Sequence, residues 1–324
     1  MTSADSDVDQ AVIVSEPRRR RVWLRVLLAA LLVLVIALAA VWLSRERIAG
    51  NVIEGQLKKY DIPATYKIAH IGPDKQVLTD IVVGDPNAPD LTVERAEVAI
   101  KYRFGTPTLG RVTLVRPRLF GTLRGGQISF GTLDKALFRK TGKPPGLPEF
   151  DVRLIDGRAL IESDYGPLGV KAEGVGQIND GFAGVIAVAA PQLGGGGCTA
   201  NGASLYGKVS TRAGKATVDG PLRLVNLSCP TQGLALRNAA LAMKATVDAD
   251  FKGVDGQGRI ETGALAAAGA RANGLTGSLR ATWRNDALTA RYSLAARGLT
   301  HPQARAALLT AEGTVRGRNG LAAL

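Results

Sequence analysis

From Ala64 to the C-terminus, apolar and polar residues alternate with a period of two, and turn residues interrupt the alternation at short intervals. The clearest runs are 96–104, 239–251 and 279–296, and the last of these turns at Asn285-Asp286. Such alternation is typical of strands that bury one face. We therefore predict a mainly β fold, an extended antiparallel sheet that is curled into a groove with one apolar face, and a single long strand over 239–251.

The N-terminal region has a different pattern. Residues 26–43 carry no charge, Trp23 and Trp42 flank them, and four arginines precede them: Arg18, Arg19, Arg20 and Arg21. This length and these flanks predict a transmembrane helix over 22–44 with interfacial tryptophans. The positive-inside rule then places a tail of residues 1–21 in the cytoplasm, and the bulk of the chain on the other side of the membrane. A cleaved signal peptide, cut near Ala37-Leu38-Ala39, is the alternative.

Apolar residues recur at helical spacing over 45–61, which predicts a short amphipathic helix ending before Pro63. This helix either caps the sheet or lies on the membrane surface. The Pro-rich segment 140–150 separates a first β subdomain (64–140) from a second one (147–324). Alanine dominates the apolar face of the later strands, so the sheet either packs on itself or leaves room for something that is not protein.

Composition limits the chemistry. The formal net charge is +13, and the chain has two His and two Cys. No nucleophile, zinc or phosphate-binding motif occurs, so we expect no enzyme activity, no metal and no cofactor. A lone His70 is more typical of a packed residue than of a base. Aromatic residues are too scattered for a nucleic-acid partner, which leaves anionic lipid headgroups or a merely solvated surface to explain the excess of basic residues.

Several stretches carry a resemblance to a known family. They are Tyr60-Asp61-Ile62-Pro63 after the predicted helices, LTDIVVGDPNAPDLTVERAEVAIKY (78–102), RVTLVRPRLFGTLRGGQISFGTLDKALF (111–138) and LPEFDVRLIDGRALIESDYGPLGVKAEGVGQI (147–178). Together they resemble the start of the AsmA-like envelope proteins, nearest to the YdbH and TamB branches. The resemblance implies an inner-membrane anchor and a periplasmic β-groove that conducts or holds phospholipids between the inner and outer membranes. Members of this branch are usually longer, so the chain is either truncated or the inner-membrane end of a longer assembly.

Two other functional classes remain open from the residues alone. One is an envelope assembly factor that binds polypeptide, and the other is a scaffold between the inner membrane and outer-membrane or periplasmic proteins. If the sheet is a groove, its acyl-chain-binding positions are the apolar sets of period two: Val98, Ile100, Tyr102, Leu241, Met243, Val247, Phe251, Leu288, Tyr292 and Leu294.

The two cysteines, Cys198 and Cys229, both flank candidate strands. An exported chain meets an oxidising compartment, so we predict a disulfide between them. Two separate buried thiols are the alternative.

Overall fold

The computed structural model describes residues 62–318, except 73, 104–105, 138–145 and 286. The predicted cytoplasmic tail, membrane anchor and amphipathic helix lie outside these residues, and so do Trp23, Trp42 and the arginines at 18–21. In the described part of the chain, no helix is both long and apolar enough to cross a bilayer.

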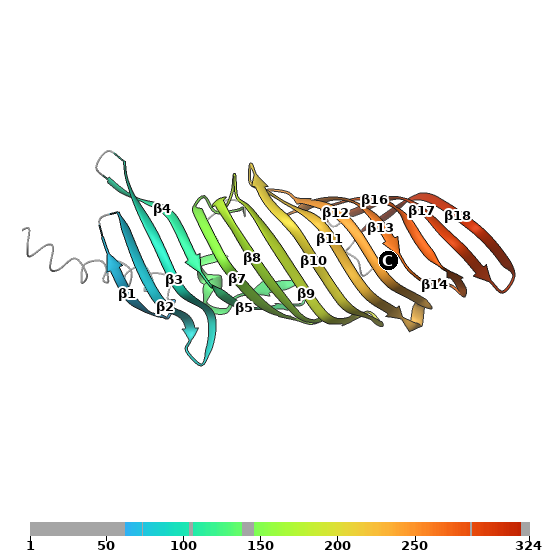
Figure 1. The fold of residues 1–324 in the computed structure, drawn as a ribbon, viewed down its shortest axis with the longest axis horizontal. Helices are drawn as coiled ribbons and strands as arrows, with labels where there is room; N and C mark the ends of the chain where they lie inside the picture. The colour runs from blue at the N-terminus through green and yellow to red at the C-terminus, as the bar shows by residue number, and fades with distance from the viewer. Residues whose placement is uncertain (1–61, 73, 104–105, 138–145, 286, 319–324) are drawn as a thin grey trace, which may run out of the picture. The chain divides into compact units, whose positions relative to one another are not determined.

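The described strands all belong to one sheet, so the fold is mainly β as predicted (Figure 1). Only short helical turns interrupt them, η1 (Gly131–Leu133), α2 (Asp134–Leu137) and η2 (Pro230–Gln232). The strands are β1 (Ala64–Ile71), β2 (Lys75–Asp85), β3 (Ala88–Arg103), β4 (Thr106–Val115), β5 (Arg118–Arg124), β6 (Gln127–Ser129), β7 (Asp151–Ser163), β8 (Gly166–Gln177), β9 (Ala183–Gly195), β10 (Cys198–Arg212), β11 (Lys215–Cys229), β12 (Leu234–Val247), β13 (Gly253–Thr262), β14 (Leu265–Ala267), β15 (Ala270–Ala272), β16 (Gly274–Arg284), β17 (Ala287–His301) and β18 (Ala304–Arg318).

Most strands pair with their neighbours in sequence and run antiparallel, but the sheet is mixed. β4 and β5 together form one interrupted strand, which pairs with β3 on one side and with β7 on the other. Both pairings with β7 are parallel. A parallel pair needs a long connection between its two strands, and residues 125–150 join the end of β5 to the start of β7. The prediction of a purely antiparallel sheet is therefore wrong at this junction.

The segment 140–150 lies between β5 and β7, which are hydrogen-bonded to each other in the same sheet. The division of the sheet into two subdomains there stays a prediction.

The run 239–251 does not form one strand. β12 ends at Val247, and a turn stabilised by the Phe251 N–H donating to the Asp248 carbonyl leads into β13. Phe251 adopts a left-handed conformation with φ 59° in this turn. The hairpin predicted around Asn285-Asp286 is confirmed, because β16 and β17 pair in register up to Arg284 and Ala287.

Irregularities bend the sheet along lines that cross several strands. Asp80 of β2, Arg116 between β4 and β5, and Asp156 of β7 all have positive φ, between 48° and 52°. The residue pairs before and after each of them show that all three lie on one line that crosses β2, β3, β4 and β7. A left-handed residue in a strand acts as a bulge, which bends the strand and increases its twist. Gly202, Asn238 and Gly298 mark a second such line among the later strands.

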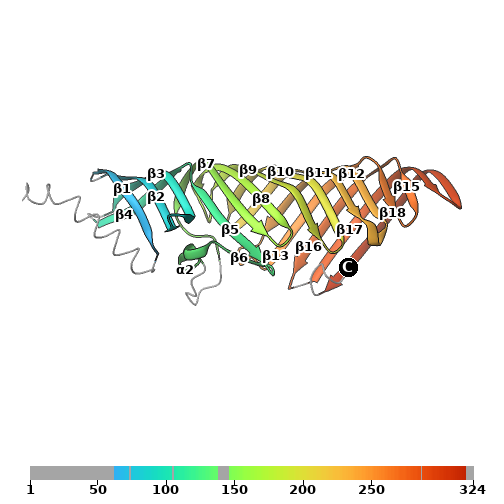
Figure 2. The ribbon, with the colours of Figure 1, turned by 90° about the horizontal axis from the view of Figure 1, so that it is seen from below.

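The result is a curled sheet without a second layer. In Figure 2, β13, β16 and β17 turn under the strands β8–β12. We call the concave side of this curl the trough. No large side chain among the described residues is fully buried. The few apolar residues that are nearly buried are dispersed along the sheet: Ile71, Val77, Val83, Val93, Ala96, Val152, Ala190, Cys229, Ala272 and Ala296. The apolar face therefore has no protein partner to cover it in the described part of the chain.

Candidate functional site

Residues that lie directly opposite each other on paired strands point to the same face of a sheet. Following these partners from strand to strand identifies a continuous row from β1 to β18, which we call the Gly174 row. Its members are Ile68, Leu78, Ala96, Leu114, Leu154, Gly174, Gly184, Val209, Val218, Ala245, Gly256, Ala281, Ala290 and Val315.

A second row, the Leu241 row, runs along the same sheet from β1 to β18. Its members are Ala64, Val83, Leu91, Leu119, Ala159, Val170, Val188, Leu205, Leu222, Leu241, Ile260, Gly277, Leu294 and Ala311. Both rows consist entirely of aliphatic residues and glycine. No polar side chain interrupts either row along the sheet.

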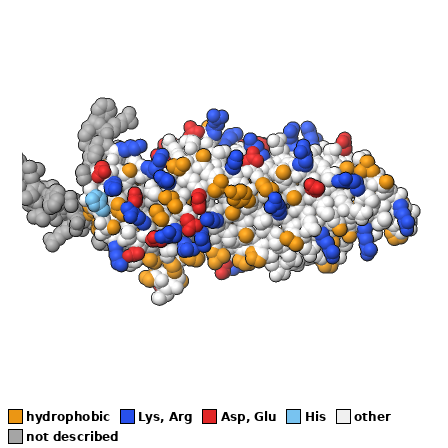
Figure 3. Space-filling view, in the orientation of Figure 1, with side chains coloured by type: hydrophobic (Ala, Val, Ile, Leu, Met, Phe, Trp, Pro, Cys, Tyr) orange, Lys and Arg blue, Asp and Glu red, His pale blue; other side chains and the backbone are white. Residues whose placement is uncertain are grey.

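The intervening positions face the other way and are mixed: many are charged or polar, others are alanine, and Phe120, Leu160 and Tyr206 are exposed there. For example, Asp219, Lys244, Gln257, Arg280 and Arg291 form a row on the opposite face. Figure 3 shows the convex side of the sheet, where Lys, Arg, Asp and Glu side chains are spread over the surface. Figure 2 shows that the sheet curls away from this side, so the Gly174 and Leu241 rows line the trough. We call the two sides the outer face and the inner face.

Glycines in the inner rows make room for a neighbouring aromatic ring. A Cβ on Gly174 would lie only 2.4 Å from Cζ of Phe182, and a Cβ on Gly184 would lie 2.3 Å from the carbonyl oxygen of Glu173. The Phe182 ring therefore lies against the backbone of β8 and β9 on the inner face. These two positions add apolar surface to the trough although their own side chains are absent.

The structure brings most of the predicted groove residues together. Leu241 and Leu294 belong to the Leu241 row. Met243 and Tyr292 lie in one row across the sheet, with Gly258 and Leu279 between them. Val247 and Leu288 lie in another row, with Val254 and Trp283 between them.

The other predicted positions differ. Val98 continues the same face through Val112 and Val152, and Ile100 lies beyond a shift in register, opposite Leu109. Phe251 lies in the turn after β12 and is 44% exposed. The side chain of Tyr102 is outside the described part of the structure.

The sequence reasoning missed the inner residues of β7–β11, including Leu154, Val170, Val188, Leu205 and Leu222. Their alternation is interrupted by glycines and by the residues with positive φ, so no long run of period two is visible there. The sequence did offer a short signal for this inner face, namely apolar residues two positions apart at Val152 and Leu154 and at Ile186 and Val188.

A disulfide closes one edge of the trough. Cys198 and Cys229 are bonded, with sulfurs 2.10 Å apart and Cα atoms 4.1 Å apart, at the point where the β10–β11 ladder ends. Beside Cys198 lies a hollow of about 340 Å³ lined by Leu168, Leu193, Ala200 and Leu227. These apolar side chains extend the inner face toward this edge.

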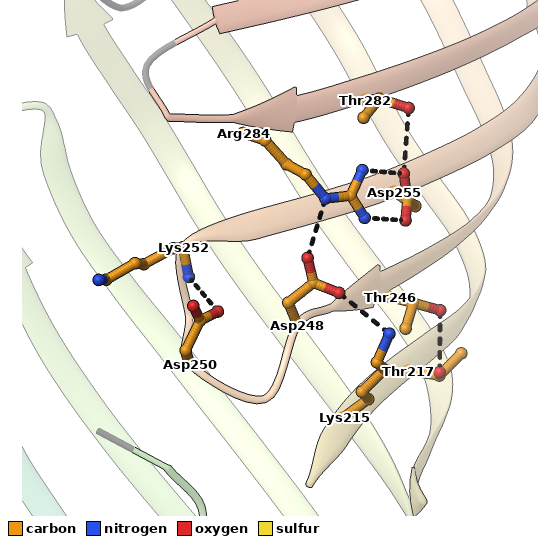
Figure 4. Close-up of polar contacts among 9 residues, drawn as sticks. All are labelled: Lys215, Thr217, Thr246, Asp248, Asp250, Lys252, Asp255, Thr282 and Arg284. Carbon is orange, nitrogen blue, oxygen red and sulfur yellow. Dashed lines mark hydrogen bonds and ion pairs between the residues drawn. The ribbon is translucent and has the colours of Figure 1, made fainter. Parts of the chain in front are cut away.

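The opposite edge carries a cluster of ion pairs at successive strand ends (Figure 4). The Lys215 ammonium lies 3.2 Å from Asp248, and Nε of Arg284 donates to the same carboxylate at 3.1 Å. Arg284 also binds Asp255 through both terminal nitrogens, at 3.0 and 2.5 Å, and the Thr282 hydroxyl donates to Asp255 at 3.0 Å. We call these residues the edge cluster. It joins the ends of β11, β12, β13 and β16, next to the residues that line the trough.

The edge cluster predicts an acid-sensitive stability. The hydrogen bond from Lys215, followed by that from Arg284, lowers the pKa of Asp248, and the hydrogen bonds from Arg284 and Thr282 lower the pKa of Asp255. A carboxyl group with a lowered pKa in the folded state stabilises the fold above its unfolded pKa of about 4, and this contribution is lost as the pH falls through the folded pKa. We expect the thermal midpoint to be level between about pH 8 and 5 and to fall below about pH 4.

The variant Asp248→Asn/Asp255→Asn should show a shallower fall, measured by circular dichroism across this pH range. Part of the fall should remain, because Arg116 lowers the pKa of Glu94 and Lys171 lowers that of Asp156. Glu312→Gln, on the outer face away from the cluster, is the control. An unchanged pH profile in the double variant would contradict a role for the edge cluster.

Within the described residues, no group of three or more His, Cys, Asp or Glu side chains could hold a metal ion. The described geometry is that of an extended apolar surface with charged edges. Such a surface can hold alkyl chains along its length while polar groups stay in water.

A family model agrees with this geometry. The YdbH-like model, described as intermembrane phospholipid transport protein YdbH, matches residues 32–322. The chain belongs to the YdbH-like family. The resemblance to the YdbH branch of the AsmA-like proteins is thereby confirmed, and the family is one of lipid transport rather than of enzymes. No curated protein and no solved structure matches this YdbH-like chain.

Proposed function

We propose that this YdbH-like chain holds phospholipids by their acyl chains in the trough and conducts them between the inner and outer membranes. The observation that carries the proposal is the pair of inner rows, which consist of aliphatic residues and glycine on each strand that they cross between β1 and β18. With neighbouring strands about 4.8 Å apart, these rows provide an apolar track roughly 60 Å long. The family description, intermembrane phospholipid transport, supports the same class of ligand.

The driving force in this proposal is the burial of alkyl surface, about 0.8 kcal/mol for each CH₂ group removed from water. The contacts are numerous and interchangeable, so a lipid can move along the rows without breaking a specific bond. The headgroup stays at the open side of the trough, in water. This arrangement needs no polar pocket and no cofactor, and it favours low selectivity among acyl chains.

The proposal also places the chain in the envelope. The uncharged run 26–43, with Trp23 and Trp42 at its ends, anchors the protein in the inner membrane, and the arginines at 18–21 keep the N-terminus in the cytoplasm. The sheet then extends into the periplasm, and β1 is the strand closest to the anchor in sequence. Lipids move along the trough between β1 and β18, in either direction.

The test is site-specific photo-crosslinking in the full chain in membranes. A photoreactive residue at position 243, on the inner face, is expected to capture phospholipid, which mass spectrometry of the adduct detects. The same residue at position 244, on the outer face, is the matched control and should capture at least tenfold less, because an exposed position holds no alkyl chain. Equal labelling at the two positions would overturn the trough and favour a scaffold or an assembly factor.

A further inference from the structure

The basic residues of the last strands are not balanced by acidic ones. No Asp or Glu occurs in residues 220–247, 262–285 or 287–311, although Arg and Lys recur throughout these segments. In the earlier strands, several cations are engaged by carboxylates, as in the pairs Arg111–Asp151 and Arg124–Asp164. The late strands therefore have an excess of positive charge that the fold itself does not neutralise.

Four of these arginines gather on the outer face at the end of the sheet remote from β1. Ala272 and Ala296 are nearly buried on the inner face, so the preceding Arg271 and following Arg297 point outward. Arg271 lies opposite Thr300, which in turn lies opposite Arg305, so these two arginines share one row. Two strand spacings separate them, about 10 Å.

Arg237 completes the group, two strands away on β12. Its neighbour Leu236 continues the inner face through Leu227 and Leu265, so Arg237 points outward. We call Arg237, Arg271, Arg297 and Arg305 the arginine face. All four are exposed, and none forms an ion pair with a residue that the structure describes. The acid that the register brings nearest is Glu261, opposite Ala240 and Thr276.

The surroundings of the arginine face indicate what kind of partner it fits. The outer-face residues between the arginines are small or neutral, such as Ser228, Ala235, Ala266 and Thr300. A protein interface usually needs a cluster of buried aromatic or aliphatic anchors, whereas the large apolar side chain that the register places beside these arginines is Leu308, opposite Arg297 and 58% exposed. Several cations around an exposed leucine match a membrane surface, because each Lys or Arg near anionic lipid contributes separately. In Figure 3, blue side chains likewise outnumber red ones toward the end of the sheet that carries β17 and β18.

We propose that the arginine face docks the late strands of the trough onto the surface of an anionic phospholipid bilayer. This inference rests on the proposed function, because a trough that conducts lipids must approach a membrane to exchange them. Docking through the outer face leaves the inner rows free for acyl chains. It also places the last strands within reach of the lipids that the trough takes up or delivers.

The experiment uses the full chain held in nanodiscs of neutral phosphatidylcholine. Binding of the nanodiscs to vesicles is measured by flotation in about 0.15 M salt, where charges further apart than about 8 Å are screened. The vesicles contain phosphatidylcholine alone or with roughly one third phosphatidylglycerol. We expect binding to the anionic vesicles only, and a loss of at least about tenfold in Arg237→Gln/Arg271→Gln/Arg297→Gln/Arg305→Gln.

The matched control removes four exposed outer-face cations of earlier strands that form no ion pair with a described residue: Arg118→Gln/Arg153→Gln/Lys208→Gln/Arg212→Gln. It has the same net charge, and its binding should stay within about twofold of the parent chain. Equal losses in the two variants would overturn the arginine face as a docking site and indicate a non-specific charge effect. Absence of binding to anionic vesicles, combined with binding to immobilised poly-glutamate that depends on the four arginines, would overturn it in favour of an acidic polypeptide.

Photo-crosslinking at position 243 separates this inference from the proposed function. The arginine variant should capture lipid from its own nanodisc as well as the parent chain does, which also shows that its trough is folded. If position 243 captures no lipid in the parent chain, the proposed function fails, whatever the vesicles show. If capture persists and docking is absent, only the inference fails.

Discussion

Leu241→Asp is expected to reduce the phospholipid captured by the trough at least tenfold. Leu241 lies near the middle of the Leu241 row, between Leu222 on β11 and Ile260 on β13. A carboxylate there has no cation opposite it on either strand. An ionised group among alkyl chains costs several kcal/mol unless it is paired, so lipids could not pass this point. Capture is measured by crosslinking at position 243 in one experiment, and by lipid that co-purifies with the chain in another.

Ala242→Asp is the matched control, because it places the same charge one residue further along the same strand. Ala242 is exposed on the outer face, opposite Pro221 and Arg259, so the new carboxylate gains a cation as neighbour. Lipid capture should stay within about twofold of the parent chain, since no alkyl chain meets this side. If Ala242→Asp reduces capture as much as Leu241→Asp does, the lipids do not lie on the inner face.

Removing the disulfide should lower the free energy of unfolding by about 3–4 kcal/mol. Cys198 and Cys229 are 31 residues apart in sequence, and crosslinking a loop of this length restricts the unfolded chain by about that amount in the loop-entropy model. A curled sheet with few buried side chains has little other stabilisation at this edge. We expect Cys198→Ala/Cys229→Ala to lower the thermal midpoint by about 10 °C.

Reduction of the parent chain with dithiothreitol should lower the midpoint by a similar amount, and the double variant should not respond to the reductant. This comparison separates loss of the crosslink from loss of cysteine packing, which affects only the variant. A parent chain whose midpoint is the same with and without reductant would show that the crosslink does not stabilise the sheet.

The trough also explains why its residues are hard to recognise individually. A row that conducts alkyl chains needs continuity rather than any one side chain, so Gly184 and Ala245 serve as well as Leu222 does. Glycine and alanine give a weak hydrophobic signal in sequence, although they complete the rows once the strands are paired. The groove residues found from the sequence are therefore the bulky members, such as Leu241 and Tyr292.

Sequence alone was sufficient for the class of fold and the apolar face of the late strands. Alternation with period two is a local property, because successive side chains of any strand point to opposite faces. The order of residues at Leu279, Ala281 and Trp283 thus predicted one face of β16 without knowledge of its neighbours. The same local reasoning placed the hairpin at Asn285-Asp286 and recognised the YdbH branch.

Only the tertiary structure decided which residues meet across the sheet. Pairing depends on strand order and register, which distant segments determine together, so the parallel junction of β5 with β7 had no local signal. The register also decided that Met243 lies in one row with Gly258, Leu279 and Tyr292, and that Arg271 shares a row with Arg305. The end of β12 at Val247 depended on a left-handed turn that no alternation reveals. The sequence determined the character of each face, and the register assembled those faces into a trough, because hydrogen bonds between strands, rather than the chain along one strand, connect the members of each row.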